Sequence, residues 1–369
     1  MSFELPPYPY DLLNTFREIA ETHNGGIVDL SVGTPCDLPP PKVVKALSQS
    51  GDEHGYPKSL GSDLYLKACA QWMERRFAIE ASASEGIAAC VGTKEFVVST
   101  PSYLRLKEPD KDTVLYPAVS YPSYAMGAEL AGCRAIPVSL DSNWRMDLES
   151  IDSEDAARAL MIWVNSPSNP TGAMEDLGEI SNWGQEHEVP VFSDECYAEF
   201  TWDKAPETIL NNTGSGLVAV HSLSKRSNLA GLRAGFYSGD EEIVHWLSEL
   251  RKHAGMMLPG PVQAAAIHAF QDDSHVETQR NLYKERLLFL QACFEELGFN
   301  VSLPQGTFYL WIRVKDGSCW DVVEYLASKL GVLVTPGVFF GESCESYLRI
   351  AAVQEMSTLT LIKERINKL

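Results

Sequence analysis

The chain has 369 residues, of which 45% are apolar and 22% charged, a balance that argues against disorder and against a fibrous fold. Lys and Arg total 30 against 50 Asp and Glu, and the resulting net charge of −20 would repel nucleic-acid phosphates and anionic lipid headgroups. Neither nucleic acid nor a membrane is therefore an expected partner, and an anionic small molecule would need a local cluster of cations.

The length predicts two domains, at roughly 100–200 residues each. No apolar run approaches the roughly 18 residues of a membrane span, and the first residues lack the basic and apolar regions of a secretion signal. Eight cysteines are scattered without a CxxC pair, which argues against a disulfide framework or a zinc ribbon. We expect a cytoplasmic protein with reduced thiols and no metal site.

Short apolar runs recur through the middle of the chain, and they are too short and too uniformly apolar for amphipathic helices. Such runs are typical of strands buried on both faces, as in a parallel sheet covered by helices. Helix-like stretches alternate with them, among them Glu175–His187 and Glu241–Lys252, which predicts an α/β domain. The predicted strands are Val114–Tyr116, Ala135–Val138, Leu160–Val164, Pro190–Phe192, Leu217–Val220 and Ala234–Tyr237.

The character of the sequence changes near Asp273. A long amphipathic helix is predicted for Gln279–Leu297, followed by a strand at Thr307–Val314, a helix at Cys319–Leu330, a strand at Tyr347–Ala352 and a terminal helix. The first 30 residues show no sheet of their own and are expected to pack against this part. We therefore predict a large α/β domain over residues 31–273 and a small α+β domain from residues 1–30 and 274–369.

The most informative segment, Ser222–Gly235, reads SLSKRSNLAGLRAG and follows a predicted strand. Its Lys225 comes just after a buried strand end, where open α/β sheets bind ligands. Partial desolvation there lowers the pKa of a lysine amine and makes it a usable nucleophile. Two serines, Ser222 and Ser224, together with Arg233 could surround a phosphate group.

This fourteen-residue segment resembles, position for position, the lysine signature of class I and II aminotransferases, which bind pyridoxal 5'-phosphate. The resemblance extends from about Gly33 to Arg349. It implies the fold of fold-type-I enzymes, in which helices sandwich a mainly parallel seven-stranded sheet in a large domain that is joined to a smaller α+β domain. It also implies that Lys225 carries the cofactor and moves the proton during transamination.

Two further motifs match the family in the right order. Asn169-Pro-Thr-Gly follows a predicted strand, and the resemblance implies that Asn169 hydrogen-bonds the phenolic oxygen of the cofactor and lines the substrate pocket. Asp194-Glu-Cys-Tyr197 ends the next predicted strand. Asp194 resembles the family's partner of the pyridine nitrogen, which it keeps protonated so that the ring withdraws electrons, and Tyr197 resembles the tyrosine at the phenolic oxygen.

The resemblance also places the phosphate on a helix start. Gly92, Thr93 and Lys94 come directly before a helical stretch, and backbone N–H groups at a helix N-terminus bind anions. Ser222 and Arg233 would add charge-assisted hydrogen bonds. An aromatic ring that stacks on the pyridine face is assigned to Tyr121, although another alignment puts Ala118 at that place.

Three more residues complete the implied pocket. Arg349 resembles the arginine that binds the substrate α-carboxylate, for which its planar fork is suited, and Gly33 matches the glycine whose backbone lines the same carboxylate. Tyr56 resembles the tyrosine that reaches from one subunit to the phosphate of its neighbour. A homodimer with shared active sites is therefore implied, with amino acids and 2-oxo acids as substrates.

A finer resemblance concerns three segments, His221–Gly231, Arg251–Ala264 and Gly306–Trp311. They are similar to actinobacterial N-succinyl-L,L-diaminopimelate aminotransferases of lysine and cell-wall precursor synthesis, which use glutamate and 2-oxoglutarate as the second pair. The long substrate ends in distal carboxylates, and Lys252 or His253 is the candidate ligand for them. The alternative for these two residues is a basic helix end that interacts with the helix dipole.

Other functions remain open at this point. An aminotransferase for a different amino acid, or a carbon–sulfur β-lyase on the same fold, would use the same lysine and arginine. A cofactor-sensing transcription regulator would need a basic helix-turn-helix segment before the enzyme-like part, yet Gly33 already belongs to the implied active site.

Overall fold

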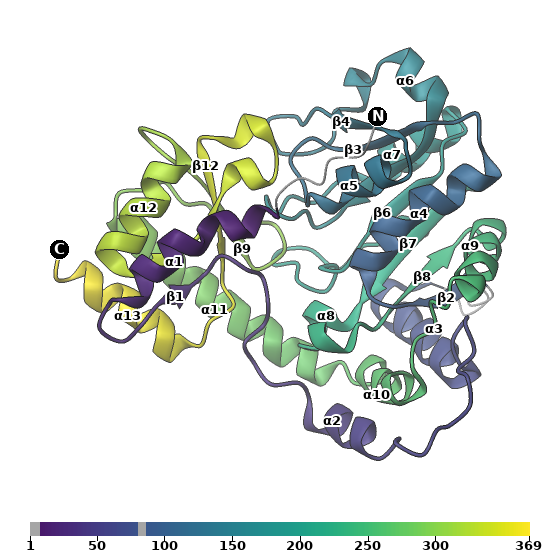
Figure 1. Ribbon diagram of the computed structural model, residues 1–369, viewed down its shortest axis with the longest axis horizontal. Helices are drawn as coiled ribbons and strands as arrows, with labels where there is room; N and C mark the ends of the chain where they lie inside the picture. The colour runs from purple at the N-terminus through teal and green to yellow at the C-terminus, as the bar shows by residue number, and fades with distance from the viewer. Residues whose placement is uncertain (1–7, 80–85) are drawn as a thin grey trace. The chain divides into compact units, whose positions relative to one another are not determined.

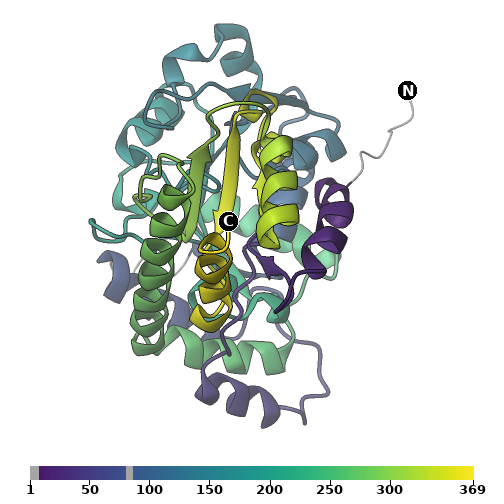
Figure 2. The same cartoon turned by 90° about the vertical axis from the view of Figure 1, so that its left-hand side faces the viewer.

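The computed structural model describes residues 8–79 and 86–369, and these form two compact units. The larger unit comprises the described residues of Leu38–Asn281 together with Gln305–Thr307. The smaller unit comprises the described part of Met1–Asp37, with Leu282–Pro304 and Phe308–Leu369. Figures 1 and 2 show their elements in two views.

A seven-stranded sheet forms the centre of the larger unit (Figure 1). All neighbouring strands run parallel except β8, which is antiparallel to β2 and β7. This confirms the predicted, mainly parallel sheet. In sheet order the strands are β2 (Ile87–Cys90), β8 (Gly235–Gly239), β7 (Leu217–Ser222), β6 (Val191–Asp194), β5 (Ala159–Asn165), β3 (Thr113–Pro117) and β4 (Arg134–Val138).

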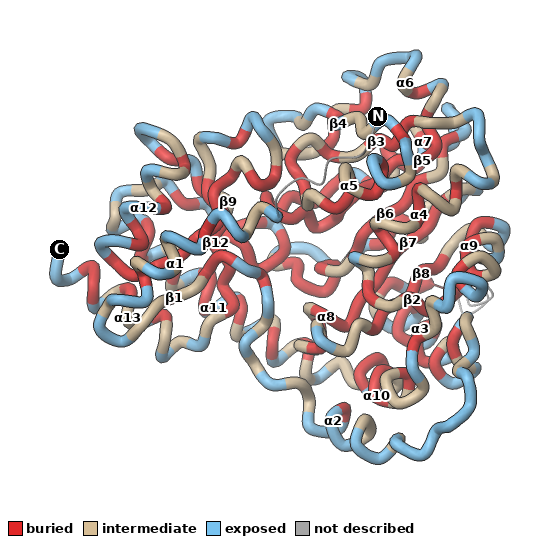
Figure 3. Tube along the Cα trace, in the orientation of Figure 1, coloured by how far each residue is buried: buried red, intermediate tan, exposed pale blue. Residues whose placement is uncertain are grey.

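Alternate residues of the central strands face two separate helical layers, because successive side chains of a strand point to opposite faces. Met161 and Trp163 of β5 pack in one cluster with α4 (Thr93–Lys107), α5 (Ser123–Leu130) and α9 (Glu241–His253). Ile162 and Val164 pack in another cluster that includes α7 (Leu177–Glu186). Burial on both faces explains the uniformly apolar runs of the sequence (Figure 3).

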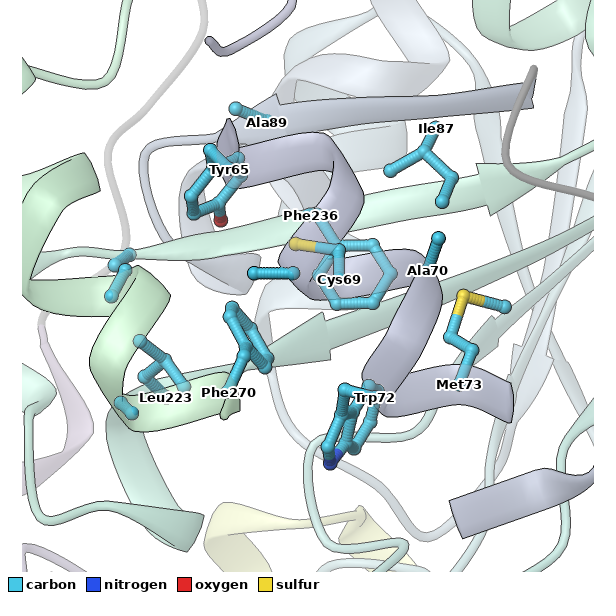
Figure 4. Packing of buried hydrophobic residues seen from close by; sticks show 14 of the residues in the cluster. Tyr65, Cys69, Ala70, Trp72, Met73, Ile87, Ala89, Leu223, Phe236 and Phe270 are labelled. Atoms are coloured by element: carbon cyan, nitrogen blue, oxygen red, sulfur yellow. The ribbon is translucent and has the colours of Figure 1, made fainter. Parts of the chain in front are cut away.

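The antiparallel edge of the sheet is covered by α3 (Asp63–Phe77) and α10 (Gly260–Phe270). Figure 4 shows the aromatic side chains that fill this part of the core. Trp72 of α3 lies 5.5 Å from Phe270 and 5.8 Å from Phe236 of β8, measured between ring centroids. The other α-helices described in this unit are α2 (Pro41–Ser48), α6 (Ser153–Arg158) and α8 (Leu223–Arg226).

The smaller unit is an α+β structure, as predicted. Its antiparallel sheet has the order β11 (Thr335–Pro336), β12 (Tyr347–Ala351) and β9 (Tyr309–Arg313). The N-terminal segment joins this unit, because β1 (Val28–Asp29) pairs in parallel with β10 (Val332–Leu333). In Figure 2 helices border the strands on either side. The helices are α1 (Asn14–Glu21), α12 (Cys319–Leu330), α13 (Met356–Ile366) and α11 (Ser274–Glu296), which begins in the larger unit.

Three parallel strands end at the same edge of the large sheet. Asn165 of β5 is in register with Asp194 of β6, and Asp194 is in register with Val220 of β7. The segment that holds Lys225 follows β7 directly. The carboxyl edge of a parallel sheet is the usual ligand-binding edge, so the topology gathers the chemistry-bearing residues there. None of the helices among the described residues is both long and apolar enough to span a membrane.

Candidate active site

Asp194 lies at the carboxyl end of β6 and is only 6% exposed. Asn165 connects it to the neighbouring turn through both ends of its side-chain amide. Its Nδ2 donates to the main-chain oxygen of Asp194 at 2.8 Å, and its Oδ1 accepts from the backbone N–H of Asn169 at 2.8 Å. The structure therefore fixes the predicted residues Asp194 and Asn169 through one buried side chain.

The carboxylate of Asp194 accepts hydrogen bonds from Cys196 and from Tyr124. The backbone N–H of Cys196 donates to Oδ1 at 3.2 Å, and the Tyr124 hydroxyl donates to Oδ2 at 3.1 Å. Burial raises the pKa of this carboxyl, and the Cys196 thiol, the two donors above and the positive charge of Lys225 oppose the increase. A buried carboxylate is thus held by specific donors and by a nearby cation.

Lys225 lies in α8, directly after β7, and its side chain is half-buried. Its positive charge opposes the increase that burial causes in the pKa values of Asp194 and Cys196, so the amine lies near the end of β6. The start of this short helix is fixed by Ser222, whose Oγ accepts from the N–H of Ser224 at 3.0 Å and donates to Ser224 Oγ at 2.8 Å. The structure brings Lys225 and Asp194 together, as the sequence predicts.

Tyr197 belongs to the turn that follows β6, and it is buried with 4% exposure. The turn is closed by a hydrogen bond from the Phe200 N–H to the Tyr197 carbonyl at 2.8 Å. Tyr197 therefore lies in the turn directly after β6, three residues beyond Asp194.

Gly92 precedes α4 with a φ of 82°, in the left-handed region that favours glycine. A Cβ atom at this position would lie 2.1 Å from Nη2 of Arg233, so the guanidinium lies against the start of the helix. The first N–H groups of α4, at Thr93 and Lys94, have no acceptor within the helix. A helix N-terminus next to a guanidinium suits a phosphate group.

Tyr121 lies between these two parts of the site. The Lys94 ammonium is 5.6 Å from the centroid of its ring. The ring also meets Tyr124 edge-on, with centroids 6.5 Å apart and an interplanar angle of 86°. Ala118, the alternative position, continues the strand by donating its N–H to the Val138 carbonyl at 2.8 Å.

Arg349 and Gly33 belong to the smaller unit. Arg349 is 2% exposed, and its Nη2 donates to the Ser31 carbonyl at 2.5 Å and to the Tyr10 hydroxyl at 3.1 Å. Its guanidinium lies 4.4 Å from the ring centroid of Tyr309. A Cβ at Gly33 would lie 1.9 Å from the hydroxyl oxygen of the same tyrosine. Both predicted carboxylate ligands therefore contact Tyr309.

Three predicted residues lie on the surface of the larger unit. Tyr56 is 96% exposed in the single chain. Lys252 and His253 are exposed in the last turn of α9, where the Lys252 ammonium lies 3.4 Å from the Glu249 carboxylate. Among the described residues of the single chain, no contact joins these three side chains to Lys225 or Asp194.

The residue before them, Arg251, was not assigned a function from the sequence. It is 2% exposed and forms a bidentate pair with Glu95 in the first turn of α4, with N···O distances of 2.9 and 2.6 Å. The signal that could have found it is its position on the apolar side of an amphipathic helix, next to the exposed Lys252.

A second pair missed from the sequence lies behind the strand end. His221 Nε2 is 3.4 Å from Oε2 of Glu195, and both residues are buried. Burial lowers the pKa of His221 to about 3 and raises the pKa of Glu195 to about 8. Burial therefore favours the neutral form of both side chains at pH 7.

Comparison with known proteins gives this geometry a context. The family model "Aminotransferase class I and II" matches residues 25–366. The chain is 40% identical to the 4-dedimethylamino-4-oxo-anhydrotetracycline transaminase of Streptomyces rimosus, over 94% of the chain and 95% of that protein. It is 34% identical to the LL-diaminopimelate aminotransferase of Aquifex aeolicus, over 99% of the chain and 97% of that protein.

Solved structures agree with this match. Substrate-bound BacF of Bacillus subtilis superposes with a TM-score of 0.90 at 28% identity, covering 100% of the chain and 98% of BacF. A probable N-succinyldiaminopimelate aminotransferase of Thermus thermophilus superposes with a TM-score of 0.86 at 26% identity, covering 98% of the chain and 100% of that protein. These similarities confirm the predicted fold-type-I architecture.

Enzymes of this family depend on pyridoxal 5'-phosphate, and the residues of the larger unit fit that cofactor. The Arg233 guanidinium lies against the start of α4 and suits the phosphate. The buried Asp194 carboxylate suits a protonated pyridine nitrogen. The Lys225 amine near Asp194 suits the aldehyde. The chain is a member of the class I and II aminotransferase family and is a pyridoxal-phosphate-dependent transaminase that acts on amino acids and 2-oxo acids.

Proposed function

We propose that this enzyme transfers the amino group between N-succinyl-L,L-diaminopimelate and 2-oxoglutarate, in the synthesis of diaminopimelate and lysine. The observation that carries the transaminase chemistry is the proximity of the Lys225 charge to the buried Asp194 carboxylate. The substrate is supported by the LL-diaminopimelate aminotransferase relative and by the structural likeness to a probable N-succinyldiaminopimelate aminotransferase.

Within this proposal Lys225 has two tasks, as the amine that holds the cofactor and as the base and acid that moves a proton at the substrate Cα. The cofactor supplies an electron sink for the charge that develops at that carbon. Asp194 keeps the pyridine nitrogen protonated, which the Tyr124 and Cys196 donors support by favouring its ionised form. Asn169 and Tyr197 are the proposed partners of the phenolic oxygen.

The phosphate is assigned to the start of α4. The N–H groups of Thr93 and Lys94 would donate to it, and Arg233 would add a charge-assisted bond because its guanidinium already lies against Gly92. Ser222 and Ser224 are proposed as further hydroxyl donors, since their Oγ atoms lie 2.8 Å apart next to Lys225. The ring of Tyr121 is proposed to stack on the pyridine face.

The substrate α-carboxylate is assigned to Arg349 and to the backbone at Gly33. Support comes from the aromatic surroundings of Arg349, whose guanidinium lies 4.4 and 4.7 Å from the ring centroids of Tyr309 and Phe340. These rings hold the planar fork in one orientation and leave little water around it, which strengthens a bidentate bond to a carboxylate.

We further propose a cytoplasmic homodimer in which Tyr56 reaches the phosphate of the neighbouring subunit. The 96% exposure of this aromatic ring in the single chain supports a role outside its own unit. Lys252 and His253 are proposed as ligands of the distal carboxylates, also across that interface. Their exposure keeps them available to a second chain.

A second candidate is the transamination of a polycyclic ketone. It is favoured by the 40% identity to a transaminase whose name gives 4-dedimethylamino-4-oxo-anhydrotetracycline as its substrate. A carbon–sulfur β-lyase is a third reaction that the same lysine and arginine could carry out.

A panel of amino donors with 2-oxoglutarate separates these candidates. The panel contains N-succinyl-L,L-diaminopimelate, LL-diaminopimelate, common amino acids and an aminated anhydrotetracycline, and mass spectrometry identifies each keto product. We expect the highest kcat/KM with the succinylated donor. A higher value with another donor would reassign the substrate, and release of pyruvate from cystathionine would identify a lyase.

A further inference from the structure

Tyr124 contacts the proposed catalytic carboxylate from α5, a helix that carries none of the site residues predicted from the sequence. Its hydroxyl oxygen lies 3.1 Å from Oδ2 of Asp194, and the side chain is 1% exposed. The ring packs against Trp163 with centroids 5.5 Å apart and an interplanar angle of 30°. Core packing therefore fixes the direction from which the hydroxyl approaches Asp194.

The surroundings of Asp194 make this donor important. Burial favours the neutral form of the carboxyl, whereas the Cys196 thiol and N–H, the Tyr124 hydroxyl and the Lys225 charge favour the ionised form. Burial raises the pKa of the adjacent carboxyl, Glu195, to about 8, which favours its neutral form at pH 7. Tyr124 donates to Oδ2, and the Cys196 thiol also hydrogen-bonds this carboxyl, so removal of the Tyr124 hydroxyl would leave the buried carboxylate with one donor fewer.

The hydroxyl of Tyr124 is also suited to remain a donor. Burial and the charge of Asp194 raise its pKa well above the ordinary value of tyrosine, so the proton stays on the oxygen throughout the working pH range. Phenylalanine would fill the same space against Trp163 and remove only this oxygen.

We propose that Tyr124 is a positioning residue for transamination, whose hydroxyl keeps the Asp194 carboxylate ionised and in one orientation toward the pyridine nitrogen of the cofactor. This inference rests on the proposed function, because it requires that Asp194 meets that nitrogen.

The first test measures Asp194 itself in the full chain without cofactor. Carboxyl carbons of aspartate are labelled with ¹³C, the Asp194 signal is assigned from an Asp194→Asn spectrum, and its pKa is followed by NMR in the wild type and in Tyr124→Phe. We expect the pKa of Asp194 to rise by about one unit or more in the variant. An unchanged pKa would overturn the inference.

The second test uses the holoenzyme and a matched control. Tyr65→Phe also removes a buried hydroxyl, one that donates to the Gly235 carbonyl at 2.8 Å and does not contact Asp194. With the natural cofactor we expect kcat to fall about tenfold in Tyr124→Phe, with KM little changed, and to stay near the wild-type value in Tyr65→Phe.

Reconstitution with pyridoxal phosphate methylated at the pyridine nitrogen shows whether the effect passes through that nitrogen. Its positive charge is permanent, so Tyr124→Phe and the wild type should turn over at equal rates with it. A tenfold deficit with both cofactors would contradict the inference while leaving the proposed function intact. A wild-type protein that fails to transaminate any donor would instead overturn the proposed function.

Discussion

Each unit buries a charged group that we assign to the reaction, Asp194 in the larger unit and Arg349 in the smaller one, and the two groups are stabilised by different means. In the larger unit Asp194 receives the Tyr124 and Cys196 donors and lies near the Lys225 charge at the end of parallel strands. In the smaller unit Arg349 donates to carbonyl and hydroxyl oxygens and lies between two aromatic rings. We infer that residues of the larger unit carry out the cofactor chemistry and that residues of the smaller unit bind the substrate carboxylate.

Arg251 of the larger unit and Arg349 of the smaller unit can be compared directly. Each is 2% exposed, and each guanidinium lies over aromatic rings. The charge of Arg251 in the larger unit is balanced by a bidentate bond to Glu95, which is typical of a structural role. The guanidinium of Arg349 donates to the neutral oxygens of Ser31 and Tyr10. The same side chain thus serves packing in one unit and, in our proposal, substrate binding in the other.

Lys225→Ala should produce the largest effect. The variant lacks the amine that we propose holds the cofactor and moves the proton, so kcat should fall by several orders of magnitude for every donor. Stopped assays with glutamate and with the succinylated donor measure this, and the thermal midpoint checks the fold. Retention of a tenth of the activity in a folded variant would remove Lys225 from the chemistry.

Asp194→Ala should produce the next largest effect. Loss of the carboxylate removes the proposed electrostatic partner of the ring nitrogen, so we expect kcat to fall by about 10²–10³-fold. Because the nitrogen serves both half-reactions, the loss should be similar for the amino donor and for 2-oxoglutarate. Single-turnover rates measured in each direction test this. Rates near those of the wild type would contradict the proposed role of Asp194 in the cofactor chemistry of the larger unit.

Arg349→Lys and Arg251→Lys test the contrast directly, since both replace a bidentate fork by a single ammonium. Arg349→Lys should lower kcat/KM by roughly 10–150-fold, the equivalent of about 1.5–3 kcal/mol, without weakening the binding of the cofactor. Arg251→Lys should instead lower the free energy of unfolding by a similar amount. Denaturant titrations and steady-state kinetics on both variants measure the two quantities.

The opposite pair of results would contradict the roles assigned to the two arginines. If Arg251→Lys changed kcat/KM at unchanged stability, or if Arg349→Lys changed only the stability, the roles of the two arginines would have to be exchanged.

Glu195 provides a smaller effect that depends on pH. Its pKa of about 8 in the fold is above the usual value of 4.5, so the stability it contributes is complete below pH 4.5 and is lost as the pH rises to 8. His221, with a pKa lowered to about 3, has the opposite slope up to its usual value of 6.5. Between pH 6.5 and 8 only the Glu195 slope remains of this pair.

The wild type should therefore lose about 2 kcal/mol of unfolding free energy between pH 6.5 and 8 relative to Glu195→Gln. Urea titrations at four pH values in this window measure the difference between the two proteins. Parallel curves would show that Glu195 does not take up a proton on folding.

Lys252→Ala and His253→Ala should have the smallest effects. Both side chains are exposed, and Lys252 already lies near Glu249, so the loss of kcat/KM should be about tenfold at most. It should appear with the succinylated donor and not with glutamate, which lacks the distal groups. Equal values for both donors would leave this segment as a basic helix end.

The strands of the large sheet could be predicted because burial on both faces leaves a uniformly apolar pattern, as in Leu160–Val164. β2 was missed, since Ile87–Cys90 has four residues, two of them alanine, and little strand propensity of its own. It is a strand because β8 pairs with it in the antiparallel direction. Such pairing depends on distant residues and leaves no local pattern.

The same reason explains which residues in and around the proposed site could be predicted. Lys225, Asp194 and Asn169 lie in contiguous motifs after predicted strands, and these motifs resemble those of the aminotransferase family in the same order, so they could be assigned from the sequence. Tyr124 and Arg251 act through partners that are 70 and 156 residues away in the sequence. Their contacts arise only when α5 and α9 pack on the sheet, and periodicity shows no more than that they face inward.

The most direct test of the account is to identify the residue that carries the cofactor. The purified enzyme is treated with borohydride, digested, and examined by mass spectrometry for a reduced pyridoxyl-phosphate adduct. The account predicts loss of the visible absorbance and one adduct, on the peptide that contains Lys225. An adduct on any other lysine, or none in a protein that binds the cofactor and transaminates, would contradict the central claim.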